Sequence, residues 1–330
     1  MYRVKLSIDV DCINQTPRRE GVWGDYQFEI NGKGEEYDFW VVYSKGVFKT
    51  EQCRVAPENT LMVTGEPSTI YHYSKGYVNQ FETLLVCRDD MKHPHQIHVQ
   101  PAQPWFIGRI ANEDSISFKT GYDDYKGKDT YNKTKLISVI SSNKAYTKGH
   151  QQRIDFVQKL KEHFGDQMDV FGRGFNGFDD KWDVVAPYKY HIAIENSSFD
   201  DYWTEKLADS FIGGAYPIYY GCPNIHQYFN KDALTVIDIK NVEKSIMQIE
   251  DVIKGNYYEK CFDKVIEAKN QVLDEYNLFA MLAKVMDGMN PKAEKKDVTI
   301  KADTSFIDFT KIRTMGFGRI INGIKRKMKL

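Results

Sequence analysis

The sequence predicts an α/β protein of two domains, and three observations support this prediction. The chain has 330 residues, which is enough for two domains of ~150 residues each. Residues 1–130 hold short apolar runs of strand length, separated by clusters of Gly, Asn, Asp and Pro. After residue 135, strand-like runs alternate with segments of helical periodicity, which is typical of the parallel βαβ units in a Rossmann-like domain.

The composition narrows the class of protein. Hydrophobic residues make up 42% and charged residues 28% of the chain, which excludes a disordered chain, a collagen-like fibre and a multi-span membrane protein. The 45 Lys and Arg residues nearly balance the 46 Asp and Glu residues, so the formal net charge is −1. Binding along nucleic-acid phosphates needs a basic surface, and we therefore expect no nucleic-acid partner.

The cysteines and the N-terminal segment bear on the compartment. The five cysteines lie far apart and form no CxxC pair, which argues against a zinc ribbon or a disulfide framework and fits a reducing compartment. The segment MYRVKLSIDV lacks the basic and apolar regions of a signal peptide, and no run of ~18 apolar residues follows it. We therefore expect a cytoplasmic protein.

The first domain is expected to be rich in strands and to end in a linker. Its predicted strands are VKLSIDV (4–10), YDFWVVYS (37–44), NTLMVTGE (59–66) and FETLLVC (81–87). The stretch 121–135 is polar and contains glycine, which is typical of a linker. We therefore predict an N-terminal domain over residues 1–130 and a second domain over 131–300.

The second domain is expected to alternate strands and helices. Strands are predicted at 135–141, 168–172, 189–196 and 215–221, helices at 150–164 and 202–212, and a mostly helical region from about 241 to 290. In parallel sheets, ligands bind beyond the carboxyl ends of the strands, where helix N-termini point at anionic groups. The loops in which we expect the functional site are 142–149, 172–177, 196–201 and 221–224.

Two motifs invite other interpretations. Residues 172–177 match the GxGxxG pattern, but no helical periodicity follows them, so we interpret them as a glycine loop and expect no NAD site. His93, His95 and His98 are of a type that binds zinc, but no Cys or carboxylate lies at a suitable ligand spacing. We interpret this stretch as a solvated or acceptor-side loop and predict no metal site.

The segment 311–330 has the pattern of a basic amphipathic helix. It carries seven Lys and Arg residues and no acid, and apolar side chains recur at helical spacing from Phe317. The pattern predicts that residues 311–330, part of a C-terminal tail over 301–330, bind an anionic membrane surface on the inner face of the plasma membrane. A helix packed on the body is the alternative, because Gly316, Gly318 and Gly323 weaken an isolated helix.

Residues 189–224 are the most informative segment. The stretch KYHIAIENSSFDDYWTEKLADSFIGGAYPIYYGCPN predicts a buried strand, a polar loop, a helix that begins at Glu205 and Lys206, and a strand that ends in a Gly-Cys-Pro turn. A helix N-terminus is already positive, so a lysine at this position suggests that an anion binds nearby. An exposed lysine without a ligand is the alternative.

This segment closely resembles the donor-binding signature of the α1,3/α1,4-fucosyltransferases, glycosyltransferase family 10. In that family an aromatic-rich strand ends in Glu-Asn-Ser, and the motifs Tyr-x-x-Glu-Lys and Pro-x-x-x-Gly-x-Pro follow. The matching residues are Glu195-Asn196-Ser197, Tyr202-Trp203-Thr204-Glu205-Lys206 and Pro217-Ile218-Tyr219-Tyr220-Gly221-Cys222-Pro223. The spacing from Glu195 to Lys206 is similar to that of bacterial members.

The resemblance continues more thinly outside this segment. Ser142-Asn143 followed by Arg153 is similar to a Ser-Asn…Arg element of the family, and Gly172-Arg173-Gly174 is similar to its glycine turn. In the first half, Thr64-Gly65-Glu66 resembles the strand-end glutamate proposed as catalytic base. Vertebrate members have Glu-Ser-Pro where this sequence has Glu66-Pro67-Ser68.

The resemblance implies a GT-B fold, in which two Rossmann-like α/β domains face a cleft that holds GDP-fucose. It implies inverting transfer with no obligatory metal, Mn or Mg being at most stimulatory, so that protein cations stabilise the leaving diphosphate. Glu66 takes the acceptor proton and Glu205 lies against the fucose, as the two catalytic residues. The donor-binding residues it implies are Ser142, Asn143, Arg153, Arg173, Glu195, Asn196, Tyr202, Glu205 and Lys206.

The resemblance also implies a class of acceptor. The family favours O3 of GlcNAc in a glycan, which yields Lewis-type or related α1,3-fucosylated structures. A cytoplasmic member would modify an oligosaccharide or lipid-linked glycan for lipopolysaccharide or capsule. Two alternatives stay open, namely a GT-B transferase that uses another nucleotide sugar, and an inactive glycan- or nucleotide-binding module.

Overall fold

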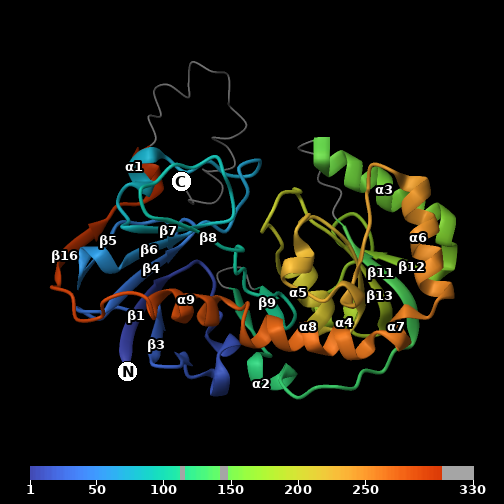
Figure 1. Ribbon diagram of the computed structural model, residues 1–330, viewed down its shortest axis with the longest axis horizontal. Coiled ribbons are helices and arrows are strands. Elements are labelled where there is room, and N and C mark those ends of the chain that lie inside the picture. The colour runs from blue at the N-terminus through green and yellow to red at the C-terminus, as the bar shows by residue number, and fades with distance from the viewer. Residues whose placement is uncertain (112–115, 142–147, 307–330) are drawn as a thin grey trace.

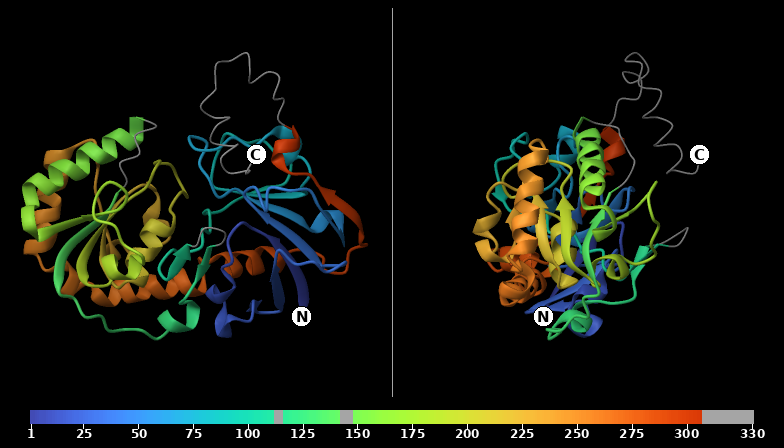
Figure 2. Two further views of the ribbon diagram at one scale, coloured as in Figure 1. Left: turned by 180° about the vertical axis from the view of Figure 1, so that it is seen from behind. Right: turned by 90° about the vertical axis from the view of Figure 1, so that its right-hand side faces the viewer.

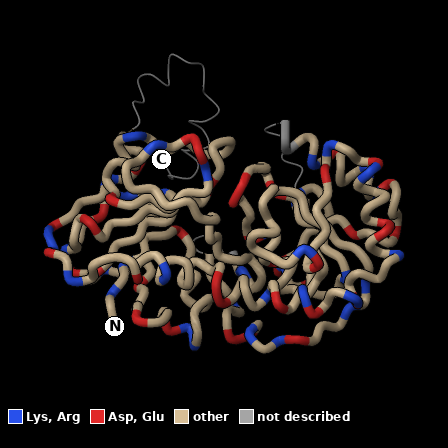
Figure 3. Tube along the Cα trace, in the orientation of Figure 1, with Lys and Arg blue, Asp and Glu red and all other residues tan. Residues whose placement is uncertain are grey.

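The computed structural model describes residues 1–111, 116–141 and 148–306, which form two α/β lobes (Figure 1). Within these ranges, no helix combines the length and the apolar content that crossing a bilayer requires. Residues of both charge signs are interspersed along the chain in both lobes (Figure 3). Ser142, Asn143 and the predicted tail 311–330 lie outside the described residues.

The first lobe is built on a seven-stranded sheet in the order β2-β3-β1-β4-β6-β7-β8, parallel except for the β2–β3 pair. Its strands are β1 (Tyr2–Ser7), β2 (Val22–Trp23), β3 (Tyr26–Ile30), β4 (Phe39–Tyr43), β6 (Thr60–Val63), β7 (Thr83–Val86) and β8 (Gln96–His98). The four predicted runs are its central strands β1, β4, β6 and β7. Strand β4 is apolar throughout and every one of its residues is buried, as expected of a parallel sheet covered on both faces, whereas β1 also carries Arg3 and Lys5.

The second lobe is built on a parallel sheet in the order β12-β11-β13-β14-β15. The strands are β11 (Lys135–Ile140), β12 (Met168–Phe171), β13 (Tyr188–Ile194), β14 (Tyr216–Tyr220) and β15 (Thr235–Val236). The helices are α3 (Lys148–Phe164), α4 (Lys181–Val185), α5 (Glu205–Ile212), α6 (Val242–Lys254), α7 (Tyr257–Lys260) and α8 (Phe262–Asp274). Helices α3 and α6 cover one side of the sheet and α5 the other (Figure 1). The predicted alternation of strands and helices is confirmed.

Shorter elements connect the two lobes and decorate the first. They are β5 (Glu51–Val55), α1 (Lys75–Val78), the antiparallel pair β9 (Arg109–Ala111) and β10 (Ile116–Phe118), and α2 (Tyr122–Tyr125). Helix α2 lies within the predicted linker 121–135, and the following residues up to β11 form neither helix nor strand. Trp105, Ile107 and Tyr125 already pack into the core of the second lobe, so the crossing begins before residue 121.

The structure corrects the predicted end of the second domain at residue 300. Helix α9 (Leu278–Met286) continues from α8 along the base of the molecule and lies beneath the first sheet (Figures 1 and 2). Its side chains Phe279 and Leu282 are fully buried in the core of the first lobe. Strand β16 (Lys296–Ile300) then pairs antiparallel with β5. The physical reason is that α9 is apolar except for the exposed Lys284, and it covers the face that this sheet leaves open. Residues 278–306 thus belong to the first domain.

Candidate active site

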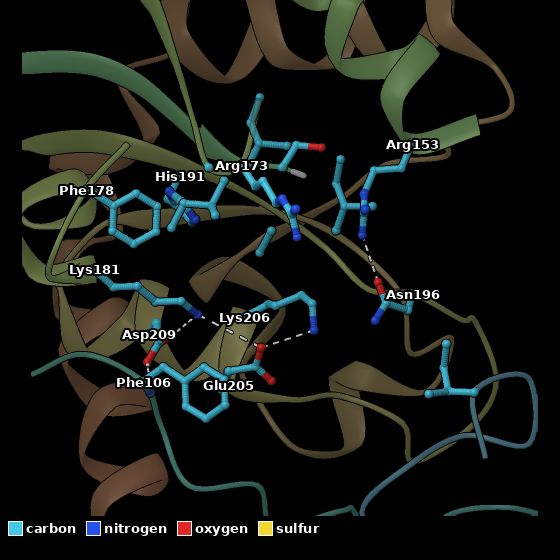
Figure 4. A pocket seen from close by; sticks show the side chains of 17 residues that line it. Phe106, Arg153, Arg173, Phe178, Lys181, His191, Asn196, Glu205, Lys206 and Asp209 are labelled. Atoms are coloured by element: carbon cyan, nitrogen blue, oxygen red, sulfur yellow. Dashed lines mark hydrogen bonds and ion pairs between the residues drawn. The ribbon is translucent and has the colours of Figure 1, made fainter. Parts of the chain in front are cut away.

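A pocket of about 520 Å³ lies at the carboxyl edge of the second sheet and faces the first lobe. Its walls come from the ends of β11, β12 and β13 and from α3, α4 and α5, while Ile70 and Phe106 close it from the first lobe (Figure 4). Of the four loops predicted to carry the site, 172–177 and 196–201 contribute lining residues. This is where a parallel α/β sheet binds ligands.

Helix α5 begins at the predicted residue because Thr204 caps it. The Thr204 side chain accepts a hydrogen bond from the Lys206 backbone, and its hydroxyl donates to Glu195 over 2.8 Å to Oε2 and 2.9 Å to Oε1. The Thr204 backbone N–H also donates to Glu195 Oε1 over 2.8 Å. The Glu195 side chain is completely buried behind this turn and does not line the pocket. Glu195 thus fixes the start of the helix.

Two lysines converge on the Glu205 carboxylate at this helix start (Figure 4). Lys206 Nζ lies 3.2 Å from Glu205 Oε1 and 3.2 Å from Glu195 Oε2. Lys181 Nζ lies 3.9 Å from Glu205 Oε1 and 2.6 Å from Asp209 Oδ2. Each acid therefore lies within reach of an ammonium group, so the cluster can be ionised although it is buried.

The pKa values in this cluster follow from burial and from these contacts. Burial alone raises the pKa of Glu205, but the nearby Lys206 and Lys181 outweigh burial and hold it well below its ordinary value. Burial lowers the pKa of Lys206, yet Glu195 and Glu205 together raise it above its ordinary value. For Glu195 burial dominates and its pKa is raised. Near neutral pH the pocket therefore presents a carboxylate at Glu205 and an ammonium at Lys206.

The pocket wall is cationic on balance. Among the described residues it carries Arg153, Arg173, Lys181 and Lys206, against the acids Glu205 and Asp209. Arg153 projects from α3, and its Nη1 donates to Asn196 Oδ1 over 2.8 Å. Arg guanidinium groups fork across pairs of phosphate oxygens, and Lys acts as a point charge. The arrangement can therefore bind a compact anion such as a diphosphate.

Lys181 and His191 are among the lining residues that the sequence interpretation missed. Lys181 is the first residue of α4, which Asp180 caps, and the sequence pattern predicted no helix there. His191 lies within the apolar strand β13, with Nδ1 2.8 Å from Ser138 Oγ. Burial, aided by two lysines, lowers the pKa of His191 to about 3, so the imidazole is neutral. Nothing in an apolar strand distinguishes such a residue from a core histidine.

Tyr202 does not line the pocket, although it is a predicted donor-binding residue. Its side chain is buried and stacks on Phe199, with ring centroids 4.7 Å apart. Asn196, Arg153, Arg173, Glu205 and Lys206 do line it, as the site prediction requires.

Glu66 belongs to the first lobe, where it follows the end of β6. Burial raises the pKa of Glu66. Two groups of the facing lobe also act on it: Lys206 lowers the pKa of Glu66, and Glu205 raises it. The two lobes also touch at this level, since Thr69 Oγ1 lies 2.8 Å from Ser197 Oγ. The structure therefore places the predicted base in the facing lobe, within electrostatic range of Glu205 and Lys206, although Glu66 itself does not line the pocket.

The histidine-rich stretch lies apart, on the exposed edge of the first sheet. His95 Nδ1 lies 2.6 Å from Glu82 Oε1, and His98 Nδ1 lies 3.8 Å from Asp89 Oδ1. In the part of the chain that the structure describes, no group of three or more His, Cys, Asp or Glu side chains is placed to hold a metal ion.

Two α/β domains that face each other across a cationic pocket have the arrangement of the GT-B fold. Residues 130–275 match the profile described as glycosyltransferase family 10 (fucosyltransferase), C-term. This match lies in the half of the chain that carries the donor-binding motifs, and it confirms the resemblance drawn from them.

Several known proteins share part of this sequence or fold. GDP-fucose protein O-fucosyltransferase 3 of Danio rerio is 33% identical over 100 residues, covering 26% of this chain and 21% of that protein. Alpha-(1,3)-fucosyltransferase B of Drosophila melanogaster is 28% identical over 152 residues, 40% of this chain and 33% of that protein. The matches thus span a fifth to a third of these relatives. A crystal structure of an α1,3-fucosyltransferase with GDP aligns over 84% of this chain and 92% of its own, at 14% identity and a TM-score of 0.46.

Proposed function

We propose that the protein transfers L-fucose from GDP-fucose to a hydroxyl group of a glycan, with inversion at the anomeric carbon. The observation that carries this proposal is the Glu205 carboxylate held between Lys206 and Lys181 in a pocket of otherwise cationic character. These residues lie within the range 130–275 that matches the profile of glycosyltransferase family 10, and Glu205 and Lys206 belong to its Tyr-x-x-Glu-Lys motif. The donor, the stereochemistry and the acceptor are parts of the proposal.

The cations stabilise the departing diphosphate. When the bond between the sugar C1 and the β-phosphate oxygen breaks, the electron pair leaves with GDP and negative charge grows on the phosphate oxygens. Arg153, Arg173 and Lys206 line the pocket in which that charge would develop, and the N-terminus of α5 adds its positive end. Because the ion pairs already hold Lys206, its ammonium needs little reorganisation during the reaction.

Glu205 acts on the sugar side of the breaking bond. Its low pKa keeps it ionised at neutral pH, and a fixed carboxylate stabilises the positive charge that develops on the ring. The same oxygens can accept hydrogen bonds from sugar hydroxyl groups. Asn196, which is held by Arg153, lies beside this region of the pocket and orients the donor.

Glu66 takes the proton of the acceptor hydroxyl. As the acceptor oxygen forms its bond to C1 on the face opposite the diphosphate, its proton passes to the Glu66 carboxylate. Burial raises the pKa of Glu66, which brings this base closer to the operating pH. A base in one lobe and a donor in the other require both lobes to stay aligned.

The remaining parts of the proposal concern metal, acceptor and location. We propose that the four cations supply the charge a metal would supply, so that Mn or Mg is at most stimulatory. The acceptor is proposed to be an oligosaccharide or lipid-linked glycan, modified at O3 of GlcNAc as in lipopolysaccharide synthesis. Peripheral membrane binding through 311–330 stays a prediction from the sequence pattern.

A transfer assay with GDP-fucose and N-acetyllactosamine in EDTA tests the proposal, with free GDP and product linkage as readouts. An α1,3-fucosylated product supports donor, reaction and metal independence together. Lys206→Ala and Arg153→Ala should weaken GDP binding in calorimetry, whereas Lys254→Ala, on the far exposed face of α6, should not. Turnover of a different nucleotide sugar would instead favour the first alternative. Binding of GDP-fucose without turnover or hydrolysis would favour the inactive module.

A further inference from the structure

The loop that carries Glu66 is held at both ends by residues outside the donor site. This segment, residues 66–74 (the Glu66 loop), runs from the end of β6 to the start of α1. Its middle reaches the second lobe, where Thr69 Oγ1 meets Ser197 Oγ at 2.8 Å and Ile70 forms part of the pocket wall. The position of the proposed base relative to the donor therefore depends on what anchors this loop.

Asp303 anchors the C-terminal end of the Glu66 loop. Its Oδ1 accepts hydrogen bonds from the Ser74 backbone N–H at 3.1 Å and from the Ser74 hydroxyl at 2.6 Å. Its Oδ2 accepts a short hydrogen bond from the Tyr71 hydroxyl. Asp303 is only 4% exposed, so an unmade hydrogen bond there could not be replaced by bulk water.

Arg88 anchors the N-terminal end of the same loop. Its Nη1 donates to the backbone carbonyl of Glu66 at 3.0 Å and to that of Tyr71 at 2.8 Å. Asp90 fixes the guanidinium from the other side, accepting from Nε at 2.5 Å and from Nη2 at 2.6 Å. Because this guanidinium is 3% exposed and doubly held, the two loop carbonyls have one defined position.

The C-terminal return of the chain brings Asp303 to this place. Strand β16 pairs with β5, and the side chain of Gln80 then exchanges two hydrogen bonds with the backbone of Lys301, at 3.0 and 2.8 Å. Asp303 follows two residues later. A segment that lies outside the matched range 130–275 thus reaches the part of the first lobe that carries Glu66.

We infer that Asp303 and Arg88 are positioning residues for Glu66, and that they hold its carboxylate in register with the donor pocket across the cleft. This inference rests on the proposed function, because it assigns the loop a catalytic task. A purely structural role for Asp303 would affect the stability of the fold. A positioning role also changes how Glu66 titrates and how fast a bound donor reacts.

The first test compares Asp303→Asn with a matched control, Asp38→Asn. Asp38 binds Lys295 of the same C-terminal return at 2.8 Å but lies at the start of β4, away from the Glu66 loop. Asp303→Asn should lower kcat about 10- to 100-fold, because small displacements of a reacting group have effects of this size. The KM for GDP-fucose should stay within about twofold of its original value, because the donor pocket belongs to the other lobe. Asp38→Asn should leave both constants unchanged.

The pH dependence of kcat distinguishes a positioning role from a purely structural one, because a change in stability alone does not shift it. The groups whose charges act on Glu66 are Lys206 and Glu205 of the facing helix, and Lys45 and Asp9 of the neighbouring strand ends. Burial raises the pKa of Glu66, so loosening the loop into water lowers it again. The acid limb of the kcat profile should therefore move to lower pH in Asp303→Asn. An acid limb and a kcat equal to those of Asp38→Asn would overturn the inference.

A second readout does not depend on activity. Hydrogen exchange of the backbone amides of residues 66–74 should be faster in Asp303→Asn, and less so in Tyr71→Phe, which removes a single hydroxyl from the network. Unchanged exchange in both variants would refute the anchoring itself. If exchange is faster in Asp303→Asn as expected but the unmodified protein transfers no fucose, the proposed function fails, and the positioning of Glu66 for transfer fails with it. If it transfers fucose and Asp303→Asn does so equally well, only the positioning is refuted.

Discussion

Replacing Lys206 by Met separates the two tasks of this side chain, stabilising the fold and binding the donor. Lys206 Nζ lies 3.2 Å from carboxylate oxygens of both Glu195 and Glu205, and the Glu195 side chain is fully buried. Removing one partner of a buried ion pair destabilises a protein by about 3–5 kcal/mol. Because the Lys206 side chain is 24% exposed, we expect the free energy of unfolding to fall by an amount at the low end of this range, about 3 kcal/mol.

The effect on donor binding is expected to be of similar size but of different origin. A charge-assisted hydrogen bond contributes about 1.5–3 kcal/mol, so loss of the ammonium should weaken GDP binding about 10- to 100-fold. Urea unfolding measures the first effect and isothermal titration calorimetry with GDP measures the second. Both should be measured at one ionic strength, because the phosphate contact is screened by salt.

The double variant Lys206→Met/Glu195→Gln distinguishes the two effects. Removing the buried charge at Glu195 together with its partner should recover much of the lost stability, since the uncompensated carboxylate is gone. The affinity for GDP should not recover, because no cation has been restored. If GDP affinity returned together with stability, Lys206 would act on the donor only through the fold, and the proposed diphosphate contact would be refuted.

Four further predictions follow from the same structure. Glu66→Gln should reduce transfer at least 100-fold, the scale of lost general-base catalysis, while calorimetry shows unchanged GDP-fucose binding; retained activity would rule out Glu66 as the base. Because the folded pKa of Glu205 is depressed, its contribution to stability is present above its unfolded pKa and is lost as pH falls through the folded value. Urea unfolding below pH 5 should therefore show a steeper loss of stability in the unmodified protein than in Glu205→Gln, and equal slopes would contradict the lowered pKa. Leu282→Ala should reduce the free energy of unfolding by about 2–5 kcal/mol, because this side chain is fully buried in the first lobe, whereas a change within about 0.5 kcal/mol would be that of an exposed residue. Deleting 311–330 should release the protein from anionic vesicles in a sedimentation assay and leave activity on a soluble acceptor intact; vesicle binding that persists would refute the membrane tail.

The elements that could be predicted from the sequence are those determined by residues that lie close together in the chain. Strand β4 is a continuous apolar run and β13 a mostly apolar one, because parallel strands are buried on both faces. The start of α5 follows from the capping threonine Thr204, and its end from Gly213. Neither feature depends on distant parts of the chain, so both could be predicted within a few residues.

The return of the chain to the first lobe could not be predicted in this way. The sequence LFAMLAKVM of α9 indicates a buried helix, but an apolar helix does not specify which sheet it covers. Its partners in the core come from β1, β3 and β4, which are separated from it by the whole second domain. Asp303 was missed for the same reason, because its partners Tyr71 and Ser74 lie 232 and 229 residues earlier.

Lys181 shows how the site itself depends on long-range contacts. Its ammonium binds Asp209, 28 residues further along the chain, and lies 5.0 Å from the Phe106 ring centroid. The second oxygen of Asp209 accepts the backbone N–H groups of Phe106, at 2.8 Å, and Ile107, at 3.1 Å, in the segment that crosses between the lobes. One buried carboxylate therefore holds both a cation of the donor pocket and the crossing segment that sets the place of the first lobe. The local sequence around each partner does not indicate these contacts. The role of Lys181 in the pocket could therefore be recognised only from the structure, in which the three segments meet.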